Sequence, residues 1–200
     1  MMKFKIWLNE SENKLPVFIG DVHGKHDEYL NLIKNHRSTI QVGDLGFDYS
    51  KIPHSDNHKF IKGNHDNYNS NHSNDLGNHG MHNGIFYVRG AQSVDKNGRI
   101  EGKNWWRNEE LNYREMSEAI QEYEVAKPNY VVSHDCPQSI AELFYDIHDA
   151  SITRQGLQRM LEIHQPSIWV FGHHHRHRDE KVGKTRFVCV EELQTFDPNQ

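Results

Sequence analysis

The stretch Phe18-Ile19-Gly20-Asp21-Val22-His23-Gly24 decides how this chain folds. Residues 17–20 are a short apolar run after Pro16, which predicts a buried β-strand. An aspartate and a histidine follow, two positions apart and flanked by glycines. Side chains at i and i+2 beyond a strand can converge on one point, and glycine lets backbone approach it. A carboxylate with an imidazole is a ligand pair for transition metals. Taken alone, a turn with an aspartate cap and a surface histidine explains the stretch equally well.

The composition limits the class of protein. The chain has 200 residues and a net charge of −5, so we expect one domain over residues 1–200 and no global attraction to nucleic acid. Two cysteines, Cys136 and Cys189, argue against a disulfide framework. The first residues lack a long apolar run, and no stretch is long enough to span a membrane. We therefore expect a cytoplasmic protein with no membrane partner, and the 16 histidines are the anomaly to explain.

Strand and helix patterns alternate along the chain. Residues 67–84 and the last residues have little periodicity, so we expect a polar loop and a polar tail there. Predicted strands cover residues 3–8 (or an arm), 17–20, 39–42, 59–62, 85–88, 130–132, 168–171 and 186–190. Predicted helices cover residues 26–36, the segment from Asn112 to Pro128, and residues 138–145 and 152–164.

Five of the predicted strands end in residues suited to metal binding or acid–base chemistry. In an α/β sheet, ligands bind just beyond the carboxyl ends of the strands. Five such endings in one chain are hard to explain as independent turns, so we expect them to form one site. The residues are Asp21, His23, Asp44, Asn64, His65, His134, His173 and His175.

The order of these blocks resembles the calcineurin-like metallophosphoesterase superfamily. That family has Asp-x-His, then Gly-Asp, then Gly-Asn-His-Asp or Gly-Asn-His-Glu, then a histidine, then Gly-His-x-His. The matching blocks here are Gly20–Gly24, Gly43–Asp44, Gly63–Asp66, His134 and Gly172–His175. Each block alone is unspecific, but the ordered set covers nearly the whole chain. The segment 105–111 also resembles small bacterial and phage members of the superfamily.

The resemblance implies a fold and a ligand set. The fold is an α/β, four-layer α/β/β/α sandwich of two mixed sheets flanked by helices, with the metal site at the carboxyl ends of the strands. Two divalent ions are implied, with manganese expected and iron, zinc, nickel or cobalt as alternatives. By the family pattern, Asp21, His23 and His175 hold one metal; Asn64, His134 and His173 hold the second; and Asp44 bridges them.

The implied activity is hydrolysis of phosphomonoesters or phosphodiesters. Two cations would neutralise the phosphate, and a hydroxide bridging them would attack phosphorus. His65 would face the phosphate as general acid or transition-state stabiliser, and Asp66 would hydrogen-bond to His65 and favour its protonated form. We expect a small phosphoester or nucleotide as substrate. Nucleic acid remains an alternative that would have to be held by local patches or by metal.

The segment after Asp44 departs from one branch of the family. Ser/Thr protein phosphatases and dinucleoside tetraphosphatases continue with an Asp-Arg pair that grips phosphate, whereas residues 43–49 here read Gly-Asp-Leu-Gly-Phe-Asp-Tyr. This puts an enzyme of that branch in doubt. Arg89, Lys103 or Arg107 could supply the missing charge, and the sequence does not choose among them.

Two other hypotheses compete with an enzymatic function. One is a non-catalytic, metal-binding scaffold on the same fold, although no ligand of the family set is missing. The other is a metal-storage or metal-sensing protein, suggested by the histidine content, although the placement of ligands at strand ends argues against it. The oligomeric state stays open.

Overall fold

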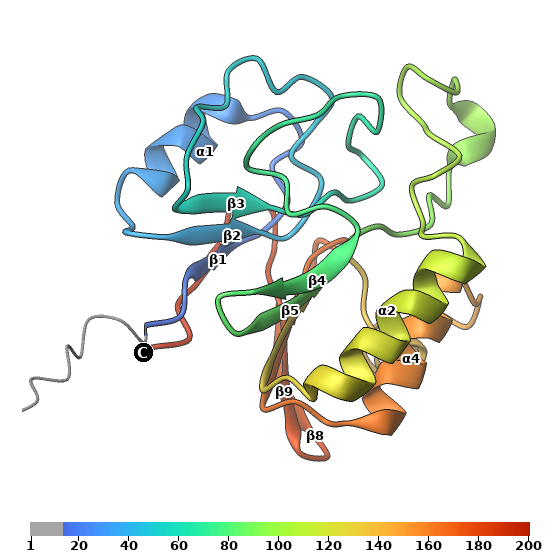
Figure 1. The fold of residues 1–200 in the computed structure, drawn as a ribbon. Helices are drawn as coiled ribbons and strands as arrows, with labels where there is room; N and C mark the ends of the chain where they lie inside the picture. The colour runs from blue at the N-terminus through green and yellow to red at the C-terminus, as the bar shows by residue number, and fades with distance from the viewer. Residues whose placement is uncertain (1–13) are drawn as a thin grey trace, which may run out of the picture.

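The computed structural model describes residues 14–200, so the strand or arm expected at 3–8 lies outside the described residues. The helices are α1 (His26–Ile33), α2 (Tyr113–Ala126), α3 (Gln138–Tyr145) and α4 (Ile152–Ile163), with a 3-10 turn η2 at Lys96–Gly98 (Figure 1). The strands are β1 (Val17–Ile19), β2 (Thr39–Gln41), β3 (His58–Phe60), β4 (His79–His82), β5 (Ile85–Val88), β6 (Tyr130–Ser133), β7 (Ile168–Phe171), β8 (Arg178–Val182), β9 (Thr185–Cys189) and β10 (Thr195–Phe196).

The strands form two mixed sheets. The first has the order β10-β1-β2-β3, in which β1, β2 and β3 are parallel and β10 is antiparallel. The second has the order β4-β5-β6-β7-β9-β8, in which the four central strands are parallel and the two edge strands antiparallel. The parallel strands of each sheet therefore end at one edge of that sheet.

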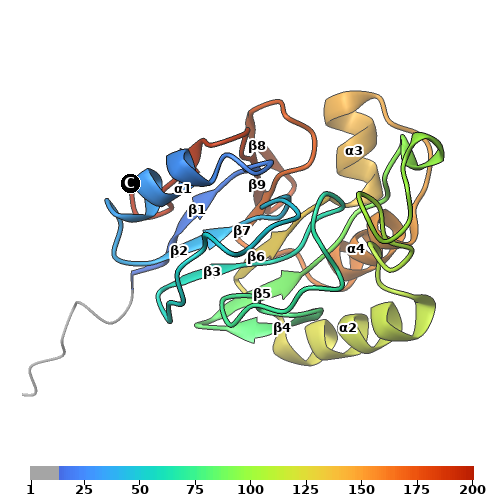
Figure 2. The ribbon, with the colours of Figure 1, turned by 90° about the horizontal axis from the view of Figure 1, so that it is seen from above.

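Alternating side chains along the strands build the layers. On β9, Phe187 and Cys189 join the apolar cluster that contains residues of α2, α3 and α4, whereas Val188 joins the cluster between the sheets. On β1, Phe18 faces between the sheets and Ile19 faces α1. Figures 1 and 2 show α1 outside the first sheet and α2 and α4 outside the second. The predicted α/β/β/α sandwich of two mixed sheets is confirmed.

Helix α2 begins where its sequence predicts. The side chain of Asn112 accepts hydrogen bonds from the backbone N–H groups of Arg114 and Glu115, and Glu115 accepts from the N–H of Asn112 in return. This capping box satisfies N–H groups that the first helical turn leaves unpaired. Met116, Ala119 and Tyr123 then form its buried face. Within residues 14–200, no helix combines the length and apolar character needed to cross a bilayer.

Three strands were not predicted. The loop expected at 67–84 contains β4, the expected polar tail contains β10, and β8 lies between the predicted strands 168–171 and 186–190. Strand β8 reads Arg-Asp-Glu-Lys-Val and is mostly exposed at the edge of its sheet. Edge strands carry charge and lack an apolar alternation, so their pairing comes from backbone hydrogen bonds that the side-chain pattern does not reveal.

Candidate metal centre

All the predicted site residues lie beyond the carboxyl ends of parallel strands. Asp21, Asp44 and Asn64 follow β1, β2 and β3 of the first sheet, while His134 and His173 follow β6 and β7 of the second. A hydrogen bond joins the loops of the two sheets here, because the backbone N–H of His173 donates to the side-chain Oδ1 of Asp21 at 3.3 Å. The fold therefore brings together side chains that are up to about 150 positions apart in the chain.

One group of four side chains could hold a cation. Ligand atoms of Asp21, His23, Asp44 and His175 all lie within 4.8 Å of one another. The Nε2 atoms of His23 and His175 are 3.0 Å apart, and His175 Nε2 lies 3.0 Å from Asp21 Oδ2. Asp21 Oδ2 is buried, and despite this close approach of His175 Nε2 it accepts no hydrogen bond of normal geometry. Imidazole and carboxylate lone pairs that converge in this way, one of them unsatisfied, fit a divalent transition metal.

A second set of potential metal ligands meets on the other side of Asp44. His134 Nε2 lies 3.1 Å from Asn64 Oδ1 and 3.2 Å from Asp44 Oδ1. The ring of His173 lies 5.1 Å from that of His134, centroid to centroid. Asp44 Oδ2 faces His23 Nε2 at 3.9 Å. One oxygen of Asp44 therefore faces each group, as a bridging carboxylate requires.

The backbone at this site is strained. Four of the predicted ligands have positive φ angles: His23 at 49°, Asp44 at 60°, His173 at 67° and His175 at 50°. The left-handed region is costly for residues with a Cβ, and such residues concentrate at functional sites. Close packing adds a second constraint, since a Cβ on Gly63 would overlap Asp44 Oδ1 and His134 Nε2.

The electrostatics of the site favour the protonated form of His134. Burial opposes the charged imidazolium, but the charge of Asp44 and its hydrogen bond outweigh burial and raise the pKa of His134 to about 10. In contrast, burial lowers the pKa of His173 to about 4, so this imidazole is neutral. The proton on His134 occupies the nitrogen lone pair that a metal would need.

Manganese binding to the metal-free protein at pH 7.5 should therefore release about one proton from His134, and affinity should rise with pH until the pKa near 10 is passed. Isothermal titration in two buffers of different ionisation enthalpy measures this release. A His134→Asn variant, which has no imidazole to deprotonate, should release about one proton fewer. Identical binding enthalpies in the two buffers would contradict the prediction.

The structure corrects the predicted contact between Asp66 and His65. Both oxygens of Asp66 accept hydrogen bonds elsewhere: Oδ2 from the N–H groups of Asp44 and Gly63 at 2.8 and 2.7 Å, and Oδ1 from Gly46 N–H and Tyr49 Oη. Asp66 is fully buried and ties the loop after β2 to the loop after β3. Its carboxylate therefore orders the loops that carry ligands, and it does not orient His65.

His65 lies beside the candidate ligands and contacts an arginine that sequence reasoning missed. Its backbone N–H donates to Asp44 Oδ1 at 2.6 Å, and Arg99 Nη2 lies 2.6 Å from His65 Nε2. Because arginine can only donate, Nε2 of His65 is the acceptor and the ring is neutral. Burial lowers the pKa of His65, and the positive charge of Arg99 adds to this effect. The expectation that Asp66 favours the protonated form was wrong.

The three cations named from the sequence are used elsewhere or lie apart. Arg89 donates to Asn78 Oδ1 and Asn108 O and packs over the Tyr68 ring. Arg107 is exposed and pairs with Glu101, and Lys103 is exposed. Arg99 follows the η2 turn, and only its spacing from Asp95 marks it in the sequence.

A buried ion pair between Asp135 and Arg154 lies next to the loop that carries His173, His174 and His175. Asp135 Oδ2 accepts from Arg154 Nε at 2.8 Å, and Asp135 Oδ1 lies 3.0 Å from His174 Nε2. The ring of His174 stacks on the ring of Tyr145, with 4.1 Å between their centroids. This contact holds His174, which lies between the predicted ligands His173 and His175, in place. Burial raises the pKa of the Cys136 thiol, so it stays protonated. This cluster serves packing, because its carboxylate is already paired.

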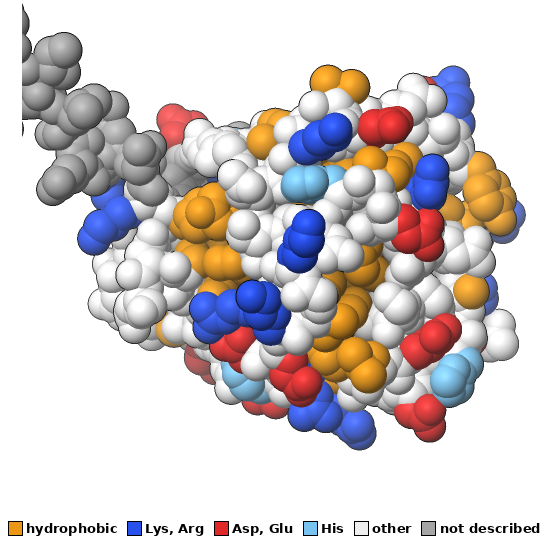
Figure 3. Space-filling model, turned by 90° about the horizontal axis from the view of Figure 1, so that it is seen from below, with side chains coloured by type: hydrophobic (Ala, Val, Ile, Leu, Met, Phe, Trp, Pro, Cys, Tyr) orange, Lys and Arg blue, Asp and Glu red, His pale blue; other side chains and the backbone are white. Residues whose placement is uncertain are grey.

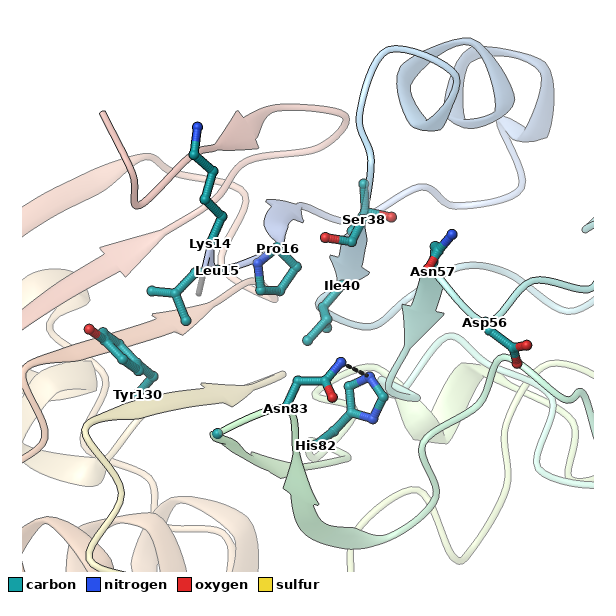
Figure 4. Close-up of a pocket in the computed structure, with 12 residues that line it drawn as sticks. Lys14, Leu15, Pro16, Ser38, Ile40, Asp56, Asn57, His82, Asn83 and Tyr130 are labelled. Carbon is teal, nitrogen blue, oxygen red and sulfur yellow. Dashed lines mark hydrogen bonds between the residues drawn. The ribbon is translucent and has the colours of Figure 1, made fainter. Parts of the chain in front are cut away.

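The candidate centre opens into a cavity of about 450 Å³. Its lining includes Asn64, His65, Asp95, Arg99 and His175. Another cavity, of about 730 Å³, lies at the amino-terminal ends of the strands and contains none of the predicted site residues. Figure 4 shows that Lys14, Tyr130 and Asp56 lie well apart around that second cavity, so its charged and phenolic groups form no cluster.

Comparison with known proteins was made by family and by sequence. A scan against models of protein families matches none of them, and a search of curated proteins finds no similar sequence. The functional assignment therefore rests on the arrangement of the residues themselves.

Proposed function

We propose that this chain is a cytoplasmic, two-metal phosphoesterase of the calcineurin-like metallophosphoesterase type. The observation that carries the proposal is the position of Asp44. Its two oxygens face two separate ligand groups, 3.9 Å from His23 Nε2 and 3.2 Å from His134 Nε2. A carboxylate between two imidazole-containing groups is the arrangement that a pair of divalent ions needs.

The ligands divide into two sets around Asp44. Asp21, His23 and His175 would hold one ion, and the unsatisfied Asp21 Oδ2 is suited to it. Asn64, His134 and His173 would hold the other. Bound ions would neutralise the charge of a phosphoester and lower the pKa of coordinated water.

The residues of the chain hold the metal ligands in position and provide a group for proton transfer. The strained loops and the carboxylate of Asp66 preorganise the ligands before any ion arrives. His65 lies beside Asp44, and its Nε2 lone pair, which accepts from Arg99, lies at the cavity. A proton gained at Nε2 could pass to the leaving oxygen of the substrate, which makes His65 the candidate general acid.

The net charge favours a small substrate over a long nucleic acid. On the one face shown in Figure 3, basic and acidic side chains are interspersed. The net charge of −5 adds no general attraction for a polyanion. We propose a small phosphoester or nucleotide as substrate, with manganese as the activating ion, because imidazole, carboxylate and amide ligands without thiolate suit it.

Treatment with a chelator should remove hydrolysis of p-nitrophenyl phosphate and of its bis ester, and manganese should restore it. The expected loss is at least about 100-fold, because the cations supply several kcal/mol of transition-state stabilisation. Circular dichroism should show that the stripped protein stays folded. Full activity in metal-free protein would refute a metallophosphoesterase. Binding of two ions without turnover on a broad phosphoester panel would indicate the non-catalytic scaffold instead.

A further inference from the structure

Arg99 occupies the open side of the candidate centre. Its Nη2 atom lies 2.6 Å from His65 Nε2, and its side chain lines the same cavity as Asn64 and His175. The side chain is only 9% exposed, although the turn that carries it is at the surface. A guanidinium therefore lies next to the residue expected to face the substrate.

The present partner of Arg99 can be replaced. Arg99 Nη2 pairs with the carboxylate of Asp95 at 2.8 Å, and that side chain is 61% exposed. Its contact from Nη1 to the carbonyl of Asn104 is long at 3.3 Å, and its contact with His65 Nε2 is between two neighbours at the cavity. An ion pair with an exposed carboxylate contributes little to stability, so an incoming dianion can displace it.

The other arginine in this cavity is already committed. Arg154 is 1% exposed and donates to Asp135 Oδ2 and to the carbonyl of Asp149, both at 2.8 Å. Removing it from Asp135 would leave a buried carboxylate without its partner, which is costly. Among the described residues that line this cavity, Arg99 is thus the arginine with an exchangeable partner.

We propose that Arg99 binds the phosphate group of the substrate and replaces the arginine that is missing after Asp44. This assignment rests on the proposed phosphoesterase function and deepens it. The planar guanidinium can donate two parallel hydrogen bonds to phosphate oxygens once Asp95 is displaced. Charge-assisted bonds of this kind favour the dianion of a terminal phosphate over the monoanion of a diester, so the substrate class is a phosphomonoester.

Kinetics and phosphate binding test the assignment in the manganese-loaded protein. Arg99→Ala should raise both the KM for p-nitrophenyl phosphate and the Ki of inorganic phosphate by about 10–100-fold, with less effect on the bis ester. Arg99→Lys should recover part of the lost phosphate affinity, because lysine keeps the positive charge but cannot donate two parallel hydrogen bonds. The matched control is Arg107→Ala, an exposed arginine on the same connection, which should change neither constant. Bound manganese should stay the same in all variants.

Asp95→Asn gives a result of opposite sign. Removing the competing carboxylate should lower the Ki of phosphate by about 2–5-fold. If Arg99 only holds the turn in shape, Asp95→Asn should instead weaken phosphate binding as Arg99→Ala does, and the assignment is overturned. Wild-type KM and Ki in Arg99→Ala would also overturn it.

Failure of the assignment can be separated from failure of the proposed function. If the wild-type protein hydrolyses esters but Arg99→Ala is unaffected, only the assignment of Arg99 fails. If the wild-type protein hydrolyses nothing, the phosphoesterase proposal fails, and calorimetry with inorganic phosphate still tests Arg99. Loss of phosphate affinity in Arg99→Ala would then support it as an anion site, and absence of phosphate binding in the wild type would overturn it.

Discussion

Asp44→Asn is expected to lower kcat/KM for p-nitrophenyl phosphate by about a thousandfold, while the protein stays folded. The carboxylate lies between the two candidate ligand groups and is 1% exposed. The substitution replaces one oxygen by an amide nitrogen, which has no lone pair for a cation, and removes the negative charge. The side chain of the variant therefore has only one atom that can bind a cation, and it cannot bridge two ions.

The fold should tolerate this change for two reasons. Asparagine adopts the left-handed backbone region about as readily as aspartate, and residue 44 has φ of 60°. Its remaining oxygen can still accept the hydrogen bond from the N–H of His65. The measurements are steady-state kinetics with manganese, metal content and the melting temperature. Asp48→Asn is the matched control on the same loop, since Asp48 is exposed and accepts a hydrogen bond from the neighbouring backbone N–H of Ser50. Wild-type kinetics in Asp44→Asn would remove the basis of the two-metal proposal.

Arg154→Met should lower the free energy of unfolding by about 3–5 kcal/mol, which for a protein of this size is roughly 10 °C in melting temperature. Arg154 and Asp135 are 1% and 0% exposed and form a hydrogen-bonded ion pair. Methionine fills much of the volume but leaves Asp135 as a buried charge whose partner is gone. The loop that carries His173 and His174 should loosen too, so bound manganese should fall.

Arg159→Met is the control for this substitution. Arg159 lies on the same helix, is 61% exposed and pairs with Glu162 at the surface, so its loss should cost less than about 1 kcal/mol. Thermal and urea unfolding of the two variants compare the costs directly. A similar small cost in both variants would show that the buried pair does not support the fold.

The same pair predicts how stability depends on pH. Burial opposes ionisation of Asp135, but His173, His174 and Arg154 outweigh burial and hold the pKa of this carboxyl below its ordinary value of 3.8. A folded-state pKa below the unfolded value stabilises the native state above the unfolded pKa, and this contribution is lost as pH falls below about 3.8. The acid-unfolding curve of Asp135→Asn should therefore be flatter in this range than that of the wild type.

Local patterns predicted much of the fold because burial and capping act over short distances. The apolar run at residues 168–171 and the capping box at Asn112 are each local to one element, and both elements were found as expected. Strand β8 was missed because its charged residues face solvent, and β10 because two residues carry no period. Strand β10 pairs with β1, far away in the chain, whereas β8 pairs with β9 in a hairpin that its charged side chains do not reveal.

The sequence by itself determined which chemical groups end the strands, because the stretch from Gly20 to Gly24 and its later counterparts place carboxylate, amide and imidazole after short apolar runs. Only the tertiary structure decided how those groups meet. It directed the oxygens of Asp66 to backbone N–H groups and brought Arg99 to His65 across a loop with no recognisable pattern. The physical reason is that strand formation depends on neighbours in the chain, whereas a side chain's partner depends on which loops the packed sheets bring within hydrogen-bond distance.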